Sequence, residues 1–426
     1  MGLSTTNQTD LEFAQAMDRD DPLRSFRGEF YIPCSEVGKP QIYFVGNSLG
    51  LQPKQTAKFV AEELEKWQRL GVRGHFSGEF PWMPYHEFLT EPMAQLVGAE
   101  RDEVVMMNSL TVNLHLMMAT FYQPTPTRAK ILIEAHAFPS DHYAVESQIR
   151  WHGFEPNESL IVVAPQPGEE TCSMDRWCEL IETHRDQLAL VLLPGMQYYT
   201  GQAFDMQRLT RCAHQYGITI GFDLAHAAGN LEMSLHDWQV DFAVWCSYKY
   251  LNSGPGSVGG CFIHRNHVAN PDLKRLAGWW GHDKTTRFKM ENEFHAMPTA
   301  EGWQLSNPPI LSLAAIRASL DVFQRAGGMK PLTEKSRRLT QFFADQLTKR
   351  LANQIEIITP PERGCQLSLK IKKGKMSSRD VKRLLDETGF ETDWREPNVI
   401  RAAPVPLYNQ FVEVYSFVDQ LVAILG

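Results

Sequence analysis

The chain has 426 residues, a hydrophobic fraction of 43% and a formal net charge of −8. This length and composition suffice for a large core and suggest about two to three domains. The negative charge leaves no basic footprint for nucleic acid, no stretch approaches the roughly 18–20 apolar residues of a membrane span, and the acidic segment 9–12 lies where a secretory signal would need an apolar core. We therefore expect a cytoplasmic protein with neither nucleic acid nor membrane as a partner.

From about residue 100 onward, apolar runs typical of strands alternate with helical stretches. Continuous apolar runs separated by helices indicate a mostly parallel sheet that is buried on both faces. Such an α/β sheet collects its ligands at the carboxyl ends of its strands. The predicted strands cover 130–134, 188–193, 218–223, 242–247 and 260–264, and the predicted helices between them cover 141–152 and 205–216.

The composition changes near residues 306–309, and a helix over 311–327 leads into a second, smaller region. We predict an N-terminal segment (1–45) packing with the small domain, a large domain (46–308) and a small C-terminal α+β domain (309–426). In the small domain we predict helices over 334–351, 378–387 and 409–425 and strands over 355–358, 366–371 and 398–402.

The cysteines number seven, and none forms a C-x-x-C pair or a His/Cys cluster with the spacing of a zinc site. Most lie inside predicted helices or strands. We therefore expect free thiols in a reducing compartment and no bound metal. The seven are Cys34, Cys172, Cys178, Cys212, Cys246, Cys261 and Cys365.

One lysine, Lys249, follows the end of a predicted strand, and Asp223 ends another. Burial disfavours the charged form of an amine, and a neutral amine can attack a carbonyl to form a Schiff base. An amine for the aldehyde and a carboxylate that keeps the pyridine nitrogen protonated are what pyridoxal 5′-phosphate requires. Taken singly, Lys249 fits a surface charge, Asp223 a helix-capping acid and His226 a core histidine, but together they favour a cofactor site.

Two further stretches suit the same cofactor. Residues 108–115 form a turn entering a helix, where Ser109 and Thr111 could be ordinary cap residues or could open an anion site for the phosphate. Phe138 follows a predicted strand and could stack on the pyridine ring or simply belong to the core. The run Gly254–Gly259 matches G-x-G-x-x-G, but a strand rather than a helix follows it, so these glycines fit a close backbone approach better than a dinucleotide site.

Seven motifs in this order resemble the kynureninase family, from about residue 25 to the end of the chain. They cover residues 43–53, 137–143, 221–226, 245–252, 278–282, 287–290 and 306–309. The resemblance implies a fold-type I, class V aminotransferase-like enzyme that depends on pyridoxal 5′-phosphate. It implies a hydrolase acting on a carbon–carbon bond of a ketone, converting L-kynurenine or 3-hydroxy-L-kynurenine to anthranilate or its 3-hydroxy form and L-alanine. It also implies a role in tryptophan degradation or in NAD biosynthesis through quinolinate.

The resemblance assigns roles by position and implies a homodimer whose subunits share the active sites. Lys249, Tyr248 and Asp223 are the expected catalytic residues, and Trp279 and Asn307 are expected from the partner subunit. The cofactor is expected to contact Leu110, Thr111, Phe138, Pro139, Ser140, Asp141, Asp223, His226, Tyr248, Lys249, Trp279 and Asn307. The substrate is expected to contact Ser48, His75, Asn307 and Arg401, where the arginine can hold a carboxylate bidentately.

Two other functions compete with this interpretation. A cysteine desulfurase or selenocysteine lyase of the same fold would need a reactive cysteine on a mobile loop, and Cys365 is the candidate for it. A partner-binding descendant without catalysis would tend to lose Lys249 or Asp223, and both are present. The sequence leaves the choice between kynurenine and its 3-hydroxy form open, because one polar pocket group such as His75 or Asn307 could decide it.

Overall fold

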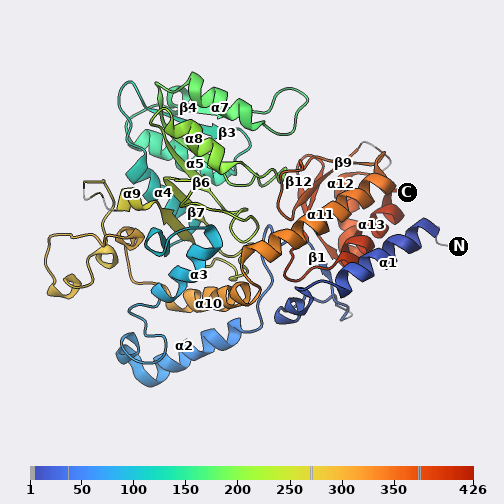
Figure 1. Cartoon of the computed structure of the whole chain (residues 1–426), viewed down its shortest axis with the longest axis horizontal. Coiled ribbons are helices and arrows are strands. Elements are labelled where there is room, and N and C mark those ends of the chain that lie inside the picture. The colour runs from blue at the N-terminus through green and yellow to red at the C-terminus, as the bar shows by residue number, and fades with distance from the viewer. Residues whose placement is uncertain (1–4, 37, 269, 271, 373, 375) are drawn as a thin grey trace.

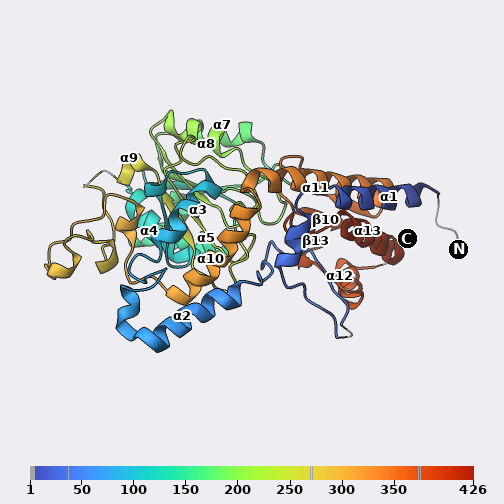
Figure 2. The ribbon, with the colours of Figure 1, turned by 60° about the horizontal axis from the view of Figure 1, so that its bottom comes forward.

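The computed structural model describes residues 5–36, 38–268, 270, 272–372, 374 and 376–426. The chain forms a larger lobe around one central sheet and a smaller lobe that carries both termini (Figure 1). The long helix α11 (Met329–Leu351) leads from the larger lobe into the smaller one, as the tilted view makes clear (Figure 2). In the part of the chain described, no helix is long and apolar enough to cross a bilayer.

Seven strands form the central sheet in the spatial order β2-β8-β7-β6-β5-β3-β4. Strands β3, β4, β5, β6 and β7 all run parallel to one another. Strand β8 runs antiparallel to both of its neighbours, β7 and β2. The mostly parallel sheet predicted from the apolar runs is therefore confirmed. The strands are β2 (Val104–Met106), β3 (Lys130–Glu134), β4 (Leu160–Val163), β5 (Leu188–Pro194), β6 (Thr219–Asp223), β7 (Phe242–Trp245) and β8 (Gly260–Ile263).

Both faces of the central sheet are covered by helices. In β5, the side chains of Leu190 and Leu192 pack on one side among residues of α4 and α5, whereas Val191 and Leu193 join the core on the other side. This alternation follows from the two-residue period of a strand. The covering helices are α4 (Leu110–Phe121) and α5 (Pro139–Trp151) on the first face and α3 (Glu87–Val97), α7 (Met174–Thr183), α8 (Met206–His214) and α10 (Ile310–Arg325) on the second.

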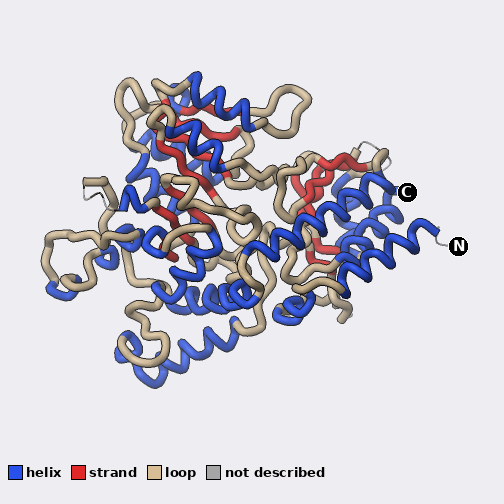
Figure 3. The backbone as a smooth tube through the Cα atoms, in the orientation of Figure 1, coloured by secondary structure: helices blue, strands red, loops and turns tan. Residues whose placement is uncertain are grey.

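The smaller lobe is built on an antiparallel sheet with the order β12-β13-β10-β9. Figure 3 shows these strands as a second group, apart from the central sheet, with helices beside them. A separate core joins this sheet to the helices and to Ala14 of the N-terminal helix. The elements are β9 (Ile355–Ile357), β10 (Leu367–Ile371), β12 (Asp393–Arg395), β13 (Val399–Ala402), α1 (Thr5–Arg19), α12 (Ser378–Glu387) and α13 (Phe411–Leu425).

The N-terminal segment and α10 lie on different lobes. The ring of Phe13 in α1 is 5.6 Å from that of Phe342 in α11, and β1 (Ile42–Tyr43) pairs in parallel with β11 (Phe390–Glu391). Helix α10 instead packs against α2 (Thr56–Leu70) and α3 of the larger lobe. The domain borders at residues 45/46 and 308/309 stay a prediction.

Most predicted elements differ from the observed ones only at their ends. The sequence patterns missed β1, β2, β4, β11 and β12, which are two to four residues long and too short to show a hydrophobic period. Helices α1, α2, α3 and α7 were not predicted either. The remaining helical segments are α6 (Pro156–Ser159), α9 (Arg265–Val268) and the 3₁₀ turns η1 (Arg24–Glu29), η2 (Gly71–His75), η3 (Arg101–Glu103), η4 (Trp279–Gly281), η5 (Arg287–Lys289) and η6 (Ala300–Trp303).

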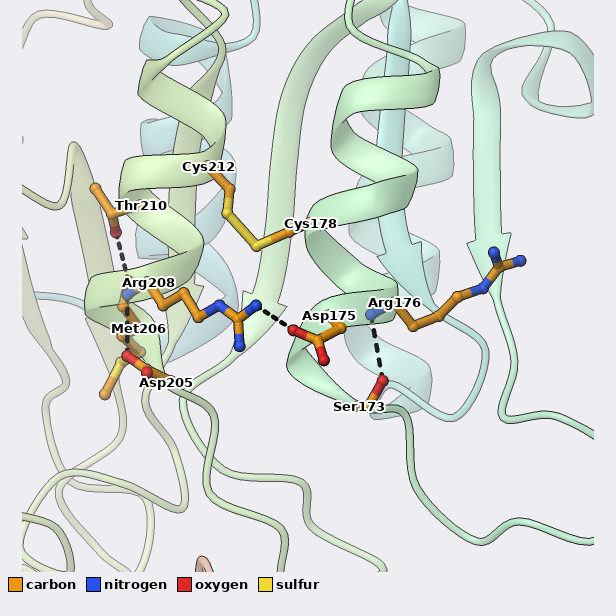
Figure 4. The surroundings of a disulfide bond; sticks show 9 residues. All are labelled: Ser173, Asp175, Arg176, Cys178, Asp205, Met206, Arg208, Thr210 and Cys212. Carbon is orange, nitrogen blue, oxygen red and sulfur yellow. Dashed lines mark hydrogen bonds and ion pairs between the residues drawn. A yellow bond between two sulfur atoms is a disulfide. The ribbon is translucent and has the colours of Figure 1, made fainter.

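The expectation that all cysteines are free thiols is wrong for two of them. Cys178 of α7 and Cys212 of α8 form a disulfide with a Cα–Cα separation of 5.6 Å (Figure 4). An ion pair between Arg208 and Asp175 joins the same two helices. The sequence pattern did not indicate the bond because the two cysteines are 34 positions apart and meet only when the helices pack side by side.

Candidate active site

A cavity of about 280 Å³ lies at the carboxyl edge of the central sheet. The ends of β3, β5, β6 and β7 and the first turns of α4 and α5 surround it, as expected for a ligand site in a parallel sheet. Residues of the smaller lobe close it from the other side. Among its lining residues are eleven of those predicted: Ser48, Leu110, Thr111, Phe138, Ser140, Asp141, Asp223, His226, Tyr248, Lys249 and Arg401.

The amine of Lys249 points at a neutral histidine. Its Nζ lies 3.0 Å from Nε2 of His226 and 5.9 Å from the centre of the Phe138 ring. Burial, and then the nearby charge of Lys249, hold the pKa of His226 well below its usual value. The imidazole is therefore neutral, Nε2 accepts from the amine, and its proton sits on Nδ1. That Nδ1 is buried and has no partner among the described residues.

Two buried carboxyl groups, which interact with each other, lie within reach of the charge of this amine. Asp223 ends β6 and accepts a 2.7 Å hydrogen bond from the amide of Ala225, while Asp141 lies in the first turn of α5. Burial, and then the charge of Asp223, hold the pKa of Asp141 well above its usual value, whereas burial raises that of Asp223 against the bond from Ala225. Of the two carboxyl groups, Asp141 therefore holds a proton more strongly, and it donates a hydrogen bond to Asp223. The Oδ1 of Asp141 is buried without a partner in the described chain.

The start of α4 offers backbone amides to the cavity. Ser109 takes the N-cap position, but its side chain caps no amide, and Thr111 instead shares a 2.9 Å hydrogen bond with Ser140 of α5. Gly259 lies against this turn, where an added Cβ would be 2.6 Å from the Trp245 carbonyl oxygen. Only glycine fits there, so the predicted close backbone approach is confirmed at Gly259. It is wrong for Gly254 and Gly256, where an added Cβ would meet no atom closer than 3.8 Å and where the positive φ (+90° and +69°) favours glycine instead. Free amides at a helix start suit an anion such as a phosphate.

Arg401 enters the cavity from β13 of the smaller lobe. Its side chain is 1% exposed, its Nη1 donates to the Tyr198 carbonyl oxygen at 2.6 Å, and its Nη2 pairs with Asp393. Its Nε is buried and has no partner among the described residues. Burial lowers the pKa of Arg401 to about 10, so the side chain stays charged near neutral pH. Such a guanidinium is suited to a carboxylate.

Four predicted residues do not line the cavity of the single chain. Pro139 is the first residue of α5 and points elsewhere, while His75 ends η2 and binds the Val72 carbonyl oxygen at 3.0 Å. Trp279 of η4 is 43% exposed and donates to the Arg287 carbonyl oxygen. Asn307 is exposed before α10.

Several lining residues were not predicted. Glu134 ends β3, and Gln197 follows β5, so both stand at strand ends where a search could have found them. Burial raises the pKa of Glu134 to about 7, against a weak bond from Gln197. Asn47 precedes the predicted Ser48. Arg395 comes from β12, a strand that no sequence pattern indicated.

A second acidic cluster in the described chain already has its cation. Glu87 and Glu301 lie near His86 in an arrangement that could hold a metal ion. The ammonium of Lys284 is 2.8 Å from Glu87 and 2.7 Å from Glu301, so the lysine supplies the positive charge. Glu103, in another such group, already accepts bonds from His236 and from the backbone of Glu100 and Arg265. Neither cluster needs an ion to be satisfied.

Cys365 is poorly placed to act as a nucleophile. Its side chain is fully buried, its amide is bound by Asn230, and β10 begins two residues later. Burial raises the pKa of its thiol to about 12, so the thiolate that attacks sulfur is scarce at neutral pH. This geometry argues against the mobile-loop cysteine of a desulfurase.

Sequence comparison finds full-length relatives. Residues 332–421 match the family model described as the kynureninase C-terminal domain. The chain is 53% identical over 421 residues to the kynureninase of Koribacter versatilis (strain Ellin345), covering 98% of each chain.

Structural comparison finds the same fold in solved structures of low sequence identity. The cysteine desulfurase CsdA from Escherichia coli superposes with a TM-score of 0.74 at 17% identity, covering 95% of this chain and 99% of that one. An alanine–glyoxylate aminotransferase from Nostoc sp. gives a TM-score of 0.68 at 15% identity, with coverage of 93% and 98%. At such identities the likeness establishes the fold alone.

Proposed function

Because the chain belongs to the kynureninase family, we propose that it hydrolyses L-kynurenine, 3-hydroxy-L-kynurenine or both. The products are anthranilate or its 3-hydroxy form and L-alanine. The observation that carries the proposal is the cavity that unites the amine of Lys249, the paired carboxyl groups of Asp141 and Asp223, and the guanidinium of Arg401. The family indicates a carbon–carbon hydrolase of an aryl ketone, and the cavity contains the amine, carboxyl and guanidinium groups that we assign to this reaction.

The residues of the cavity fit pyridoxal 5′-phosphate as the cofactor. Lys249 would hold the aldehyde carbon, the amides at the start of α4 with Thr111 would hold the phosphate, and ionised Asp223 would hold the protonated ring nitrogen. Phe138 borders the space beside the amine. Oδ1 of Asp141 and Nδ1 of His226 are buried and have no hydrogen-bond partner among the described residues. A polar ligand would supply the missing hydrogen bonds.

Each catalytic residue has a distinct task. The bound cofactor supplies an electron sink for bond cleavage. Arg401 binds the substrate carboxylate and orients Cα toward Nζ of Lys249, which moves the proton at that carbon. Tyr248 keeps its proton because burial raises its pKa, so the phenol can donate to Cβ after the aryl product leaves. Neutral His226 accepts from the amine of Lys249 and orients it.

We extend the proposal to a homodimer in which the partner completes the cavity. His75, Trp279 and Asn307 lie outside the cavity of one chain and on segments with exposed apolar side chains. Phe76, 70% exposed, follows His75, and the half-exposed ring of Phe288 lies 5.5 Å from that of Trp279. Exposed apolar patches of this kind suit a subunit interface.

The dimer can be tested by mixing two inactive variants, Lys249→Ala and Asn307→Ala. If the partner supplies Asn307, hybrid dimers contain one site with both residues intact and regain part of the activity. Unmixed variants give the baseline. No recovery after confirmed subunit exchange would contradict shared sites.

The proposal also covers the cellular location and the pathway of the protein. We place it in the cytoplasm, in tryptophan degradation or in NAD biosynthesis through quinolinate, with a small-molecule substrate as its ligand. We keep the three predicted regions, with borders near residues 45 and 308, although helix α10, which follows the second border, packs against α2 and α3 of the larger lobe. The location and the pathway are inferred from the family.

The central experiment is turnover by the purified protein with added cofactor. We expect anthranilate fluorescence from kynurenine and the visible absorbance of a lysine-bound cofactor, and Lys249→Ala should lose both. Cysteine offered in parallel should release little alanine. Comparing kcat/KM for kynurenine and its 3-hydroxy form then selects the substrate. A yellow protein that cleaves cysteine and leaves kynurenine intact would refute the proposal.

A further inference from the structure

We propose that Asp393 is a positioning residue of the carboxylate subsite, which fixes Arg401 and Ser48 so that the arginine presents its Nε to the substrate. The inference rests on the proposed function, because it assumes an amino-acid substrate held by Arg401. Asp393 does not line the cavity and does not touch the reacting atoms. It acts through the three side chains that bond to it.

Strand register brings Asp393 to this place. In the antiparallel pair β12–β13, Asp393 lies directly opposite Arg401. Side chains alternate along β12, so Asp393 and Arg395 share one face while Trp394 takes the other. The indole of Trp394 donates to Ser378 at 2.9 Å and stacks under Arg379, which anchors the strand against α12. The direction of the Asp393 carboxylate is thereby set by the backbone.

Three donors of the cavity wall converge on one oxygen of Asp393. Its Oδ2 accepts from Ser48 Oγ at 3.0 Å, from Arg395 Nη2 at 3.0 Å and from Arg401 Nη2. Ser48 belongs to the loop after β1, whereas the arginines belong to the small sheet. The carboxylate therefore joins the two sides of the cavity at the point where an amino acid would bind.

The hydrogen bonds of Arg401 show which of its nitrogen atoms is left for the substrate. The Tyr198 carbonyl oxygen holds Nη1, and Asp393 holds Nη2. The buried Nε is left without a partner among the described residues. A guanidinium tethered at both ends cannot turn, so Nε–H points in one direction. Holding a donor in place before binding raises affinity because less freedom is lost on binding.

Two ligands that differ by one carboxylate distinguish a positioning role of Asp393 from a general disruption of the site. L-Alanine and ethylamine both add an amine to the holoenzyme, but only alanine can use Arg401, and the cofactor absorbance reports both. In Asp393→Ala we expect a loss of about 10- to 100-fold in alanine affinity, the range for a charged hydrogen bond, with ethylamine affinity unchanged. For kynurenine, KM should rise while kcat is retained.

Matched variants complete the test. Asp393→Asn keeps an acceptor and should restore most of the alanine affinity. Asp419→Asn removes a carboxylate paired at 2.7 Å with Arg350 on the surface and should leave both ligands unaffected. If Asp393→Ala does not fold, Asp393→Glu provides the test, because it displaces the carboxylate oxygen by one methylene. This variant should weaken the binding of alanine and leave that of ethylamine unchanged.

Two outcomes would overturn the inference. One is an equal loss for alanine and ethylamine, which would indicate a structural role only, and the other is unchanged alanine affinity in both Asp393→Ala and Asp393→Glu. Failure of the wild-type holoenzyme to bind either ligand would instead refute the proposed function. The two failures are therefore distinguishable.

Discussion

The disulfide between Cys178 and Cys212 should contribute measurably to stability. It closes a loop of 34 residues between α7 and α8. In the chain-entropy model, a cross-link over such a loop removes roughly 12–13 cal/mol/K of entropy from the unfolded chain, or about 3.8 kcal/mol at 25 °C. Replacing both cysteines by serine is therefore expected to lower the free energy of unfolding by about this amount. Turnover should be retained, because neither helix lines the cavity.

Denaturant unfolding with and without dithiothreitol measures the effect. The oxidised wild type should unfold at a higher midpoint than the reduced wild type, and the double serine variant should match the reduced protein under both conditions. Thiol titration of the denatured, unreduced chain should find the five free cysteines. Cys34→Ser, at an exposed free thiol, is the control and should not shift the midpoint. Seven titratable thiols and a midpoint indifferent to reductant would refute the reasoning.

Three further predictions concern single side chains of the site and its surroundings. Tyr248→Phe should lower kcat by about 10²- to 10⁴-fold and change its pH profile, as expected for a lost proton donor; full turnover would remove that role. Burial raises the pKa of Glu134 to about 7 from 4.5, so the folded state keeps a proton that the unfolded state loses, and stability should fall as the pH rises between these values. Glu134→Gln should thus be more stable than the wild type at pH 8, by about 3 kcal/mol, and equal to it at pH 4, as denaturant unfolding would report; parallel pH curves would contradict this. Cys365→Ser should retain kynurenine turnover. Loss of turnover in this variant would favour the desulfurase hypothesis.

The candidate site could be predicted from sequence where its residues follow long apolar strands. The runs that end at Asp223 and precede Lys249 are continuous and buried, so their strand character was visible locally. Parallel neighbours in one sheet bring such ends together without further information. Glu134 ends a strand and Gln197 lies three residues after one. Both were missed because neither was paired with a second group of matching chemistry, as Asp223 was with Lys249.

Other parts of the site had no local signal. Strand β12 is three residues long, so nothing in the sequence indicated that Asp393 would lie opposite Arg401. The Tyr198 carbonyl oxygen that holds Arg401 comes from a loop of the other lobe, 203 positions away in the chain. Such contacts depend on how the lobes dock.

By itself the sequence determined that this protein has a mostly parallel α/β core with a lysine and an aspartate at neighbouring strand ends, because hydrophobic periodicity and strand-end position are local properties. Only the tertiary structure decided which carboxyl group keeps the proton, that Cys178 meets Cys212, and that Asp393 tethers Arg401. Burial and contact between residues distant in the chain set these features, and neither is encoded in any short stretch of residues.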